Sequence, residues 1–287
     1  MPRNMQAATD WEKLTIANDF VFCKAMLDDN LCKAVLEAVL GIEIDRVEHV
    51  ERQHMIDVGP ESKSVRLDVY VKDDKGTVYD VEMQVCRDTG LTRRARYYHA
   101  QMAIEQLEKG DRYRELPNAF AIFFCLFDPF GLGSRVYSFE NRCREREGLA
   151  LGDGATTLFL AVPSPTDESQ SDCLNSLLDY IASGTAEGEL PRRVDERVKH
   201  VIGSTEWRRE YMLLEWRDQD NIDKGYAMGK QDGEERLGTL IARLLEQGRV
   251  DDATKAATSP AERERLMREL DIEHETRQTR AEYAWAK

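Results

Sequence analysis

Two acidic residues, Asp68 and Glu82, lie in stretches of alternating polar and apolar residues that predict two adjacent β-strands. The stretches are residues 65–72 and 77–86, and the turn sequence Asp73-Asp74-Lys75-Gly76 between them predicts a hairpin. Successive side chains of a strand point to opposite faces, so Glu82 shares its face with Gln84. The hairpin then places Asp68 and Glu82 in neighbouring positions on one polar surface.

Two carboxylates held together repel each other unless a cation or a shared proton relieves the repulsion. Hard oxygen ligands of this kind suit Mg²⁺, with Mn²⁺ as a substitute, and leave coordination positions for water and a phosphate oxygen. Gln84 is placed to orient an attacking water, so the three residues predict a hydrolytic site for phosphodiesters. Spacing alone favours a simpler alternative, in which these polar side chains face solvent.

A helix predicted over residues 92–109 carries Arg94, Tyr98 and Gln101 on one stripe, at positions i, i+4 and i+7. We expect this stripe to flank the acidic surface and bind phosphate oxygens, although a solvated helix face explains the same pattern. The segment 87–96 is basic within an acidic chain, so a DNA backbone is expected to dock there.

Composition excludes several classes of protein. The chain has 54 acidic and 40 basic residues, a net charge of −14, which argues against coating nucleic acid by bulk positive charge. The longest apolar run, residues 119–127, is shorter than the roughly 20 residues that span a bilayer, and the chain starts without a secretory signal. We therefore expect a cytoplasmic protein without a membrane span. The six cysteines form no C-x-x-C pair, so a zinc site is not expected.

The order of predicted elements is α-β-β-β-α-β with additions. A helix is expected over residues 18–40, with Asn18 and Asp19 as capping residues and Gly41 as its stop. Further strands are predicted over residues 46–53, 119–127, 135–139 and 156–162. The pattern predicts an α/β fold with a central mixed sheet.

The sequence becomes charged and favours helices after Pro165, which predicts one domain over residues 1–165 and a helical C-terminal region over residues 166–287. Helices are expected over residues 174–182, 192–202 and 207–216. Glycines at every fourth position from 225 to 233 weaken a helix, so a flexible link or assembly segment is expected there. A terminal helical hairpin follows, and its last helix starts at Ser259-Pro260. Self-association explains these helices better than a helix-turn-helix, because Asp251 and Asp252 repel phosphate.

Four segments together resemble the recombination-promoting nuclease (Rpn) and transposase-like branch of the PD-(D/E)XK nuclease superfamily. They lie at residues 18–24, 66–69, 79–85 and 94–98, and read NDFVFCK, RLDV, YDVEMQV and RARYY. The resemblance covers residues 18–162. It implies a PD-(D/E)XK nuclease-like α/β core with a mixed sheet flanked by helices, and an α-helical extension after it.

The resemblance also implies Mg²⁺-dependent endonucleolytic cleavage of DNA and a link to recombination or mobile elements. Asp68 and Glu82 match the metal-binding acids of the family motif, and Met83 would contribute only its carbonyl. Gln84 stands where the wider superfamily has lysine, which removes a positive charge from the site. Two alternatives remain open at this point: a catalytically silent nuclease-fold protein that binds DNA or a protein through its helical tail, and a purely structural oligomerisation protein.

Overall fold

The computed structural model describes residues 11–56 and 65–272 of the chain. It divides into two compact units, Met1–Tyr211 and Met212–Lys287. The boundary that the sequence predicts after residue 165 therefore falls inside the first unit. The change in composition at Pro165 follows the end of the sheet, whereas the apolar stripes of the next two helices, α4 (Asp172–Ser183) and α5 (Glu189–Gly203), are buried within the first unit.

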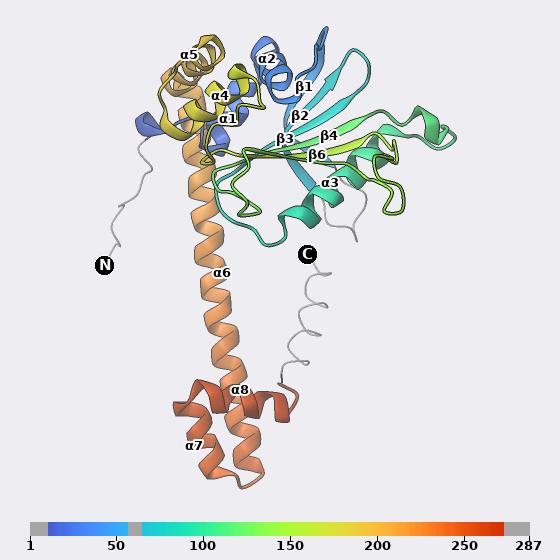
Figure 1. The fold of residues 1–287 in the computed structure, drawn as a ribbon. Coiled ribbons are helices and arrows are strands. Elements are labelled where there is room, and N and C mark those ends of the chain that lie inside the picture. Colours follow the sequence, from blue (N-terminus) through green and yellow to red (C-terminus); the bar gives the residue numbers. More distant parts are fainter. Residues whose placement is uncertain (1–10, 57–64, 273–287) are drawn as a thin grey trace. The chain divides into compact units, whose positions relative to one another are not determined.

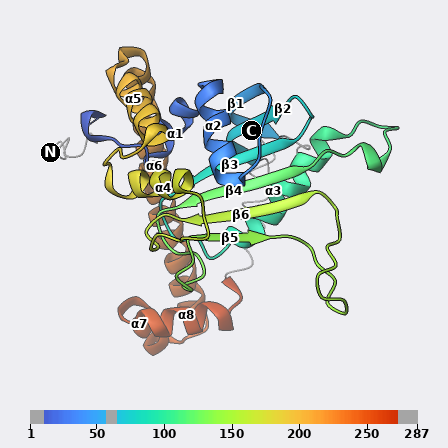
Figure 2. The ribbon, with the colours of Figure 1, turned by 45° about the horizontal axis from the view of Figure 1, so that its top comes forward.

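A six-stranded mixed sheet forms the centre of the first unit (Figures 1 and 2). Its strand order is β1-β2-β3-β4-β6-β5, in which β3, β4 and β6 are parallel and the other pairs are antiparallel. The strands are β1 (Val47–Ile56), β2 (Val65–Asp73), β3 (Val78–Gln84), β4 (Ala119–Cys125), β5 (Val136–Phe139) and β6 (Ala155–Ala161). The predicted α/β fold with a central mixed sheet is confirmed.

The turn between β2 and β3 fixes the hairpin. The Asp73 carboxylate accepts hydrogen bonds from the backbone N–H groups of Lys75 at 2.9 Å and Thr77 at 2.8 Å, and from the Tyr79 hydroxyl at 2.7 Å. Gly76 has a φ of 80°, a conformation that disfavours residues with a Cβ. The predicted turn is confirmed, and its side-chain contacts set the register of the two strands that carry the acids.

Helices cover both faces of the sheet (Figure 1). Consecutive residues of β4 show this, because Phe123 stacks on Tyr98 of α3 (Leu91–Gln106) whereas Phe124 contacts Phe22 of α1 (Asp19–Met26). Residues 121–125 of β4 are all fully buried as a result. A strand covered on both faces explains why residues 119–127 are almost wholly apolar.

The helix predicted over residues 18–40 is in fact two helices, and the prediction of a single helix was wrong. Asn18 caps α1 by accepting from the N–H of Val21 at 3.1 Å, as the sequence indicates. Asp28 separates the two helices, because its carboxylate accepts from the N–H of Leu31 at 3.0 Å and caps a new helix, α2 (Asp29–Leu40).

The glycine-punctuated segment is helical throughout, contrary to the expectation of a flexible link. Helix α6 runs over Thr205–Glu246 and contains the helix predicted at residues 207–216. A Cβ added at Gly225, Gly229 or Gly233 would meet no atom within 4 Å. These glycines therefore lower the intrinsic stability of the helix without serving a close contact.

The second unit is a small helical cluster. The end of α6 packs against α7 (Val250–Thr258) and α8 (Pro260–Glu269), and its buried residues include Leu240, Leu244, Ala256 and Leu266. Ser259 caps α8 by accepting from the N–H of Glu262 at 3.4 Å, as the Ser-Pro sequence predicts. None of the helices in the described ranges is long and apolar enough to cross a membrane.

Two glycine substitutions should act in opposite directions. Gly76→Ala forces a Cβ into a positive-φ turn, so we expect it to lower the free energy of unfolding by about 1 kcal/mol. Gly229→Ala removes a helix-weakening residue from open space, so we expect it to increase helicity and stabilise α6 by up to about 1 kcal/mol. Urea titrations followed by circular dichroism measure both, and a stabilising Gly76→Ala would contradict the turn assignment.

Candidate active site

Asp68 and Glu82 lie next to each other on adjacent strands. The ladder pairs Val69 with Val81, so the same register places Asp68 opposite Glu82. The backbone N–H of Asp68 donates to Glu82 Oε1 at 3.0 Å, and the N–H of Met83 donates to Asp68 Oδ2 at 3.4 Å. The two carboxylates that the sequence singles out are thus brought together on one face of the sheet.

Burial distinguishes this surface from the solvent-facing alternative. Helix α3 lies over the face of the sheet that carries the acids, and residues Val78–Met83 are all buried. Glu82 is only 3% exposed, while Asp68 is half-buried. Glu82 therefore does not face solvent, and the simpler alternative is wrong for this residue.

A third acid, Asp80, belongs to the same surface. It is fully buried, and neither of its carboxylate oxygens accepts a hydrogen bond from any described residue. Burial raises its pKa well above the usual value, and the negative charges of Glu82 and Asp68 raise it further. The raised pKa favours the protonated, neutral form of Asp80 in this buried position. The sequence places Asp80 two residues before Glu82 on the same face, and that spacing was the available signal for its involvement.

Glu82 is held by hydrogen bonds to both of its oxygens. Besides the Asp68 N–H, Gln84 Nε2 donates to Glu82 Oε2 at 3.2 Å. Burial raises the pKa of Glu82 to about 8, with a further contribution from the charge of Asp68, and the Asp68 N–H and the charge of Arg94 oppose this rise. Glu82 is therefore poised to change protonation state near neutral pH.

Gln84 connects Glu82 to a cation on α3. Its Oε1 accepts a short hydrogen bond from Arg94 Nη2, while its amide nitrogen donates to Glu82. Arg94 also pairs with Asp88 at 3.7 Å and lies 5.9 Å from the centre of the Tyr98 ring. Gln84, which the sequence predicts to orient water, thus lies between the buried acid and the arginine.

The predicted stripe of Arg94, Tyr98 and Gln101 faces the sheet. Tyr98 and Gln101 are 7% and 3% exposed, and Gln101 Oε1 is buried without a hydrogen-bond partner among the described residues. Burial and the charge of Glu82 raise the pKa of Tyr98 above its usual range. The exposed arginines of the predicted basic segment are instead Arg87, Arg93 and Arg96.

The donors at this surface suit a hard divalent ion. Within residues 11–56 and 65–272, no group of three or more His, Cys, Asp or Glu side chains converges as a metal site. The adjacent carboxylates of Asp68 and Glu82 are nevertheless the kind of pair that Mg²⁺ uses, since it keeps several waters and binds through one or two carboxylates. The side chain of Met83 lies buried on the opposite face, so only its backbone can reach this surface.

Comparison with known proteins identifies one similarity. Residues 17–190, more than half of the chain, match the family model described as PD-(D/E)XK nuclease family transposase. Searches of the curated proteins and of the solved structures gave no match.

The raised pKa of Glu82 predicts how stability depends on pH in the metal-free protein. The folded protein keeps the proton up to about pH 8, whereas an unfolded chain releases it near pH 4.5. Between these values the folded state binds more protons, so the free energy of unfolding should fall as pH rises. Glu82→Gln should flatten this decline by on the order of a few kcal/mol.

Urea unfolding in EDTA at pH 5.5 and pH 8 measures this effect, with the exposed Glu168→Gln as a matched control. If Glu82→Gln and the wild type lose the same stability between the two pH values, then Glu82 is not the buried acid that titrates.

Proposed function

The chain belongs to the PD-(D/E)XK nuclease family of transposases, and from this premise we propose that it is a Mg²⁺-dependent DNA endonuclease that acts in recombination or the movement of mobile elements. The observation that carries the proposal is the pair of adjacent acids, Asp68 and Glu82, on neighbouring strands, where Glu82 accepts from the Asp68 N–H and Asp68 accepts from the Met83 N–H. This pair lies within the matched region of the chain.

In the proposed mechanism Asp68 and Glu82 would hold Mg²⁺, or Mn²⁺ in its place, and the backbone carbonyl of Met83 would be a further oxygen donor. A bound divalent ion lowers the pKa of a coordinated water and stabilises charge that develops on a phosphate. Glu82 must release its proton to take this role. The Arg94 charge and the Asp68 N–H both favour that release.

Gln84 and Arg94 replace the lysine of the wider superfamily in this proposal. Gln84 positions Glu82 through its amide and holds Arg94 through its carbonyl. Arg94 places a permanent positive charge beside the acids, where it can stabilise a phosphate oxygen in the transition state. Tyr98 and Gln101 line the buried side of this surface and position substrate from there.

The DNA backbone is proposed to dock along the solvent side of α3. Arg93 and Arg96 are exposed on this helix, and Arg87 is exposed just before it. In an acidic chain this local cluster supplies the phosphate contacts that nuclease binding requires.

A second candidate function is a catalytically silent nuclease-fold protein that binds DNA or a protein partner through its helical tail. It is favoured by the engagement of Gln84, whose amide is already bonded on both sides. Calorimetric titration with Mg²⁺ separates the two candidates. An active nuclease should bind Mg²⁺ and lose this binding in both Asp68→Asn and Glu82→Gln, whereas a silent protein should show no binding linked to these residues.

Cleavage itself is tested with supercoiled plasmid. We expect nicking in Mg²⁺ that EDTA abolishes, and we expect Asp68→Asn or Glu82→Gln to lower the rate by about 100-fold or more, because each removes a metal-binding charge. Glu168→Gln removes an exposed carboxylate after β6 and should keep the wild-type rate. Equal nicking by Asp68→Asn and the wild type, with both proteins folded, would contradict the assignment.

A further inference from the structure

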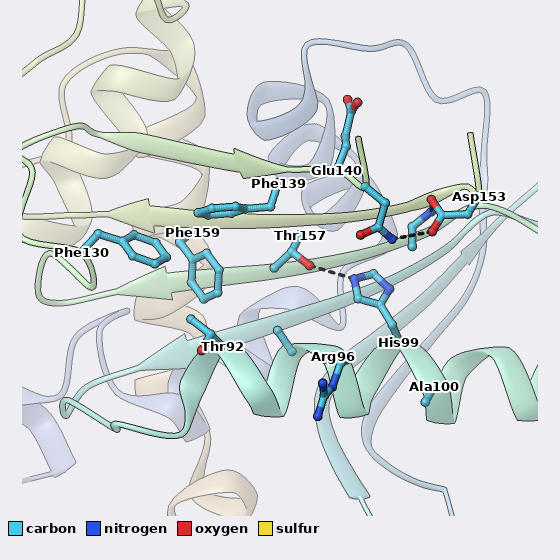
Figure 3. Close-up of a pocket in the computed structure, with 13 residues that line it drawn as sticks. Thr92, Arg96, His99, Ala100, Phe130, Phe139, Glu140, Asp153, Thr157 and Phe159 are labelled. Carbon is cyan, nitrogen blue, oxygen red and sulfur yellow. Dashed lines mark hydrogen bonds between the residues drawn. The ribbon is translucent and has the colours of Figure 1, made fainter. Parts of the chain in front are cut away.

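A cavity separate from the acids lies between α3 and the far edge of the sheet, where β6 pairs with β5 (Figure 3). Its volume is about 570 Å³. Helix α3 contributes Thr92, Arg96 and His99 to its lining, and β5 and β6 contribute Phe139, Thr157 and Phe159. None of the acids Asp68, Asp80 and Glu82 lines it.

Three phenylalanines form an aromatic wall on one side of this cavity. The ring centres lie 5.2 Å apart for Phe130 and Phe139, 5.3 Å for Phe130 and Phe159, and 5.8 Å for Phe139 and Phe159. Phe159 is buried, whereas Phe139 on the edge strand is 46% exposed. The wall therefore presents one accessible ring on which a planar ligand can stack.

Polar groups lie at the other end of the cavity. His99 contacts Thr157 Oγ1 through Nε2 at 2.9 Å, and its Nδ1 is buried without a hydrogen-bond partner among the described residues. Asn141 donates to Asp153 Oδ2 at 2.6 Å, and both residues line the cavity. Burial lowers the pKa of His99, so at neutral pH the ring is uncharged and offers one donor and one acceptor.

The aromatic wall and the polar end together favour one chemical class of ligand. An apolar ligand would leave His99 Nδ1 unpaired, and an anion would be repelled by Asp153 and Glu140, which both line the cavity. A planar ring with ring nitrogens and an amino group satisfies the aromatic wall and the polar end together. Arg96 is exposed, and Figure 3 shows it directed away from the three rings, so a phosphate attached to such a ring can remain outside.

We propose that this cavity is a nucleobase-binding site, in which one base stacks on Phe139 and hydrogen-bonds to His99 and the Asn141–Asp153 pair. The source of the base is an unstacked nucleotide of the DNA or a free nucleoside. The DNA source rests on the proposed nuclease function, whereas the base-binding chemistry stands on the cavity alone.

The test compares a fluorescently labelled oligodeoxyadenylate with an abasic oligomer of equal length and charge, measured by anisotropy in EDTA so that no cleavage occurs. Stacking on an aromatic ring is worth enough that Phe139→Ala should weaken binding of the oligodeoxyadenylate by at least about fivefold. Affinity for the abasic oligomer should not change. Tyr113→Ala removes an aromatic ring that is 91% exposed outside the cavity, and should leave both affinities unchanged.

Phe139→Leu guards against a packing defect, because it keeps an apolar side chain of similar size but lacks the aromatic face. It should show the same selective loss, and circular dichroism checks that both variants are folded. Equal weakening for the base-containing and abasic oligomers, or no weakening in either variant together with no binding of free adenosine, would overturn the proposal.

Titration with free adenosine identifies the source of the base. Saturable binding that Phe139→Ala removes, without any difference between the two oligomers, assigns the site to a free nucleoside. Plasmid nicking is measured in parallel on the same variants. Nicking without Phe139-dependent base binding would contradict this inference but not the nuclease function. Base binding without nicking would contradict the nuclease function but not this inference.

Discussion

The burial of acidic groups beneath α3 is the constraint on which the rest of the first unit depends. Asp80 and Glu82 are almost completely removed from water, and Asp68 lies beside them. Burying carboxylates is unfavourable unless they are protonated, hydrogen-bonded or close to a cation, and here raised pKa values, hydrogen bonds and the charge of Arg94 offset this cost. Protonation favoured by the raised pKa values of Asp80 and Glu82, the strand N–H groups and the Gln84–Arg94 hydrogen bond together stabilise the sheet around these acids.

Helix α3 borders both proposed functional surfaces because of its periodicity. At about 100° per residue, Arg94, Tyr98 and Gln101 fall on one flank of the face that packs on the sheet, and Thr92, Arg96 and His99 fall on the other. The first flank covers the acids of β2 and β3, and the second borders the cavity next to β5 and β6. Ala95 and Met102 lie between the flanks and anchor the helix to the hydrophobic core.

The sequence predicts the sheet well because local signals determine it. Alternation identifies β2 and β3, Gly76 identifies their turn, and the apolar run 119–127 identifies a strand covered on both faces. The pairing of Asp68 with Glu82 follows from the same alternation. The burial of that face does not follow from the alternation, because it depends on α3 folding back over the strands. A polar face has the same sequence pattern whether a helix or solvent covers it. The burial of Asp80 was not predicted for this reason.

The remaining differences have local physical causes. Asp28 interrupts an apolar pattern that otherwise continues from Phe20 to Leu40, and a single capping carboxylate outweighs that periodicity. Glycine propensity alone predicted a break within α6. The helix continues because the residues around the glycines are strong helix formers. The aromatic cavity combines residues from α3, β5, β6 and loops far apart in sequence, so no short motif reveals it.

The burial of Asp80 and Glu82 also bears on how such a protein evolves. Apolar residues of similar size at these two positions would suit their buried surroundings better than acids do. In a lineage no longer selected for chemistry at this surface, drift should therefore replace both acids quickly and raise thermal stability as it does so. Retention of both carboxyl groups in descendants would mark continuing selection for their function.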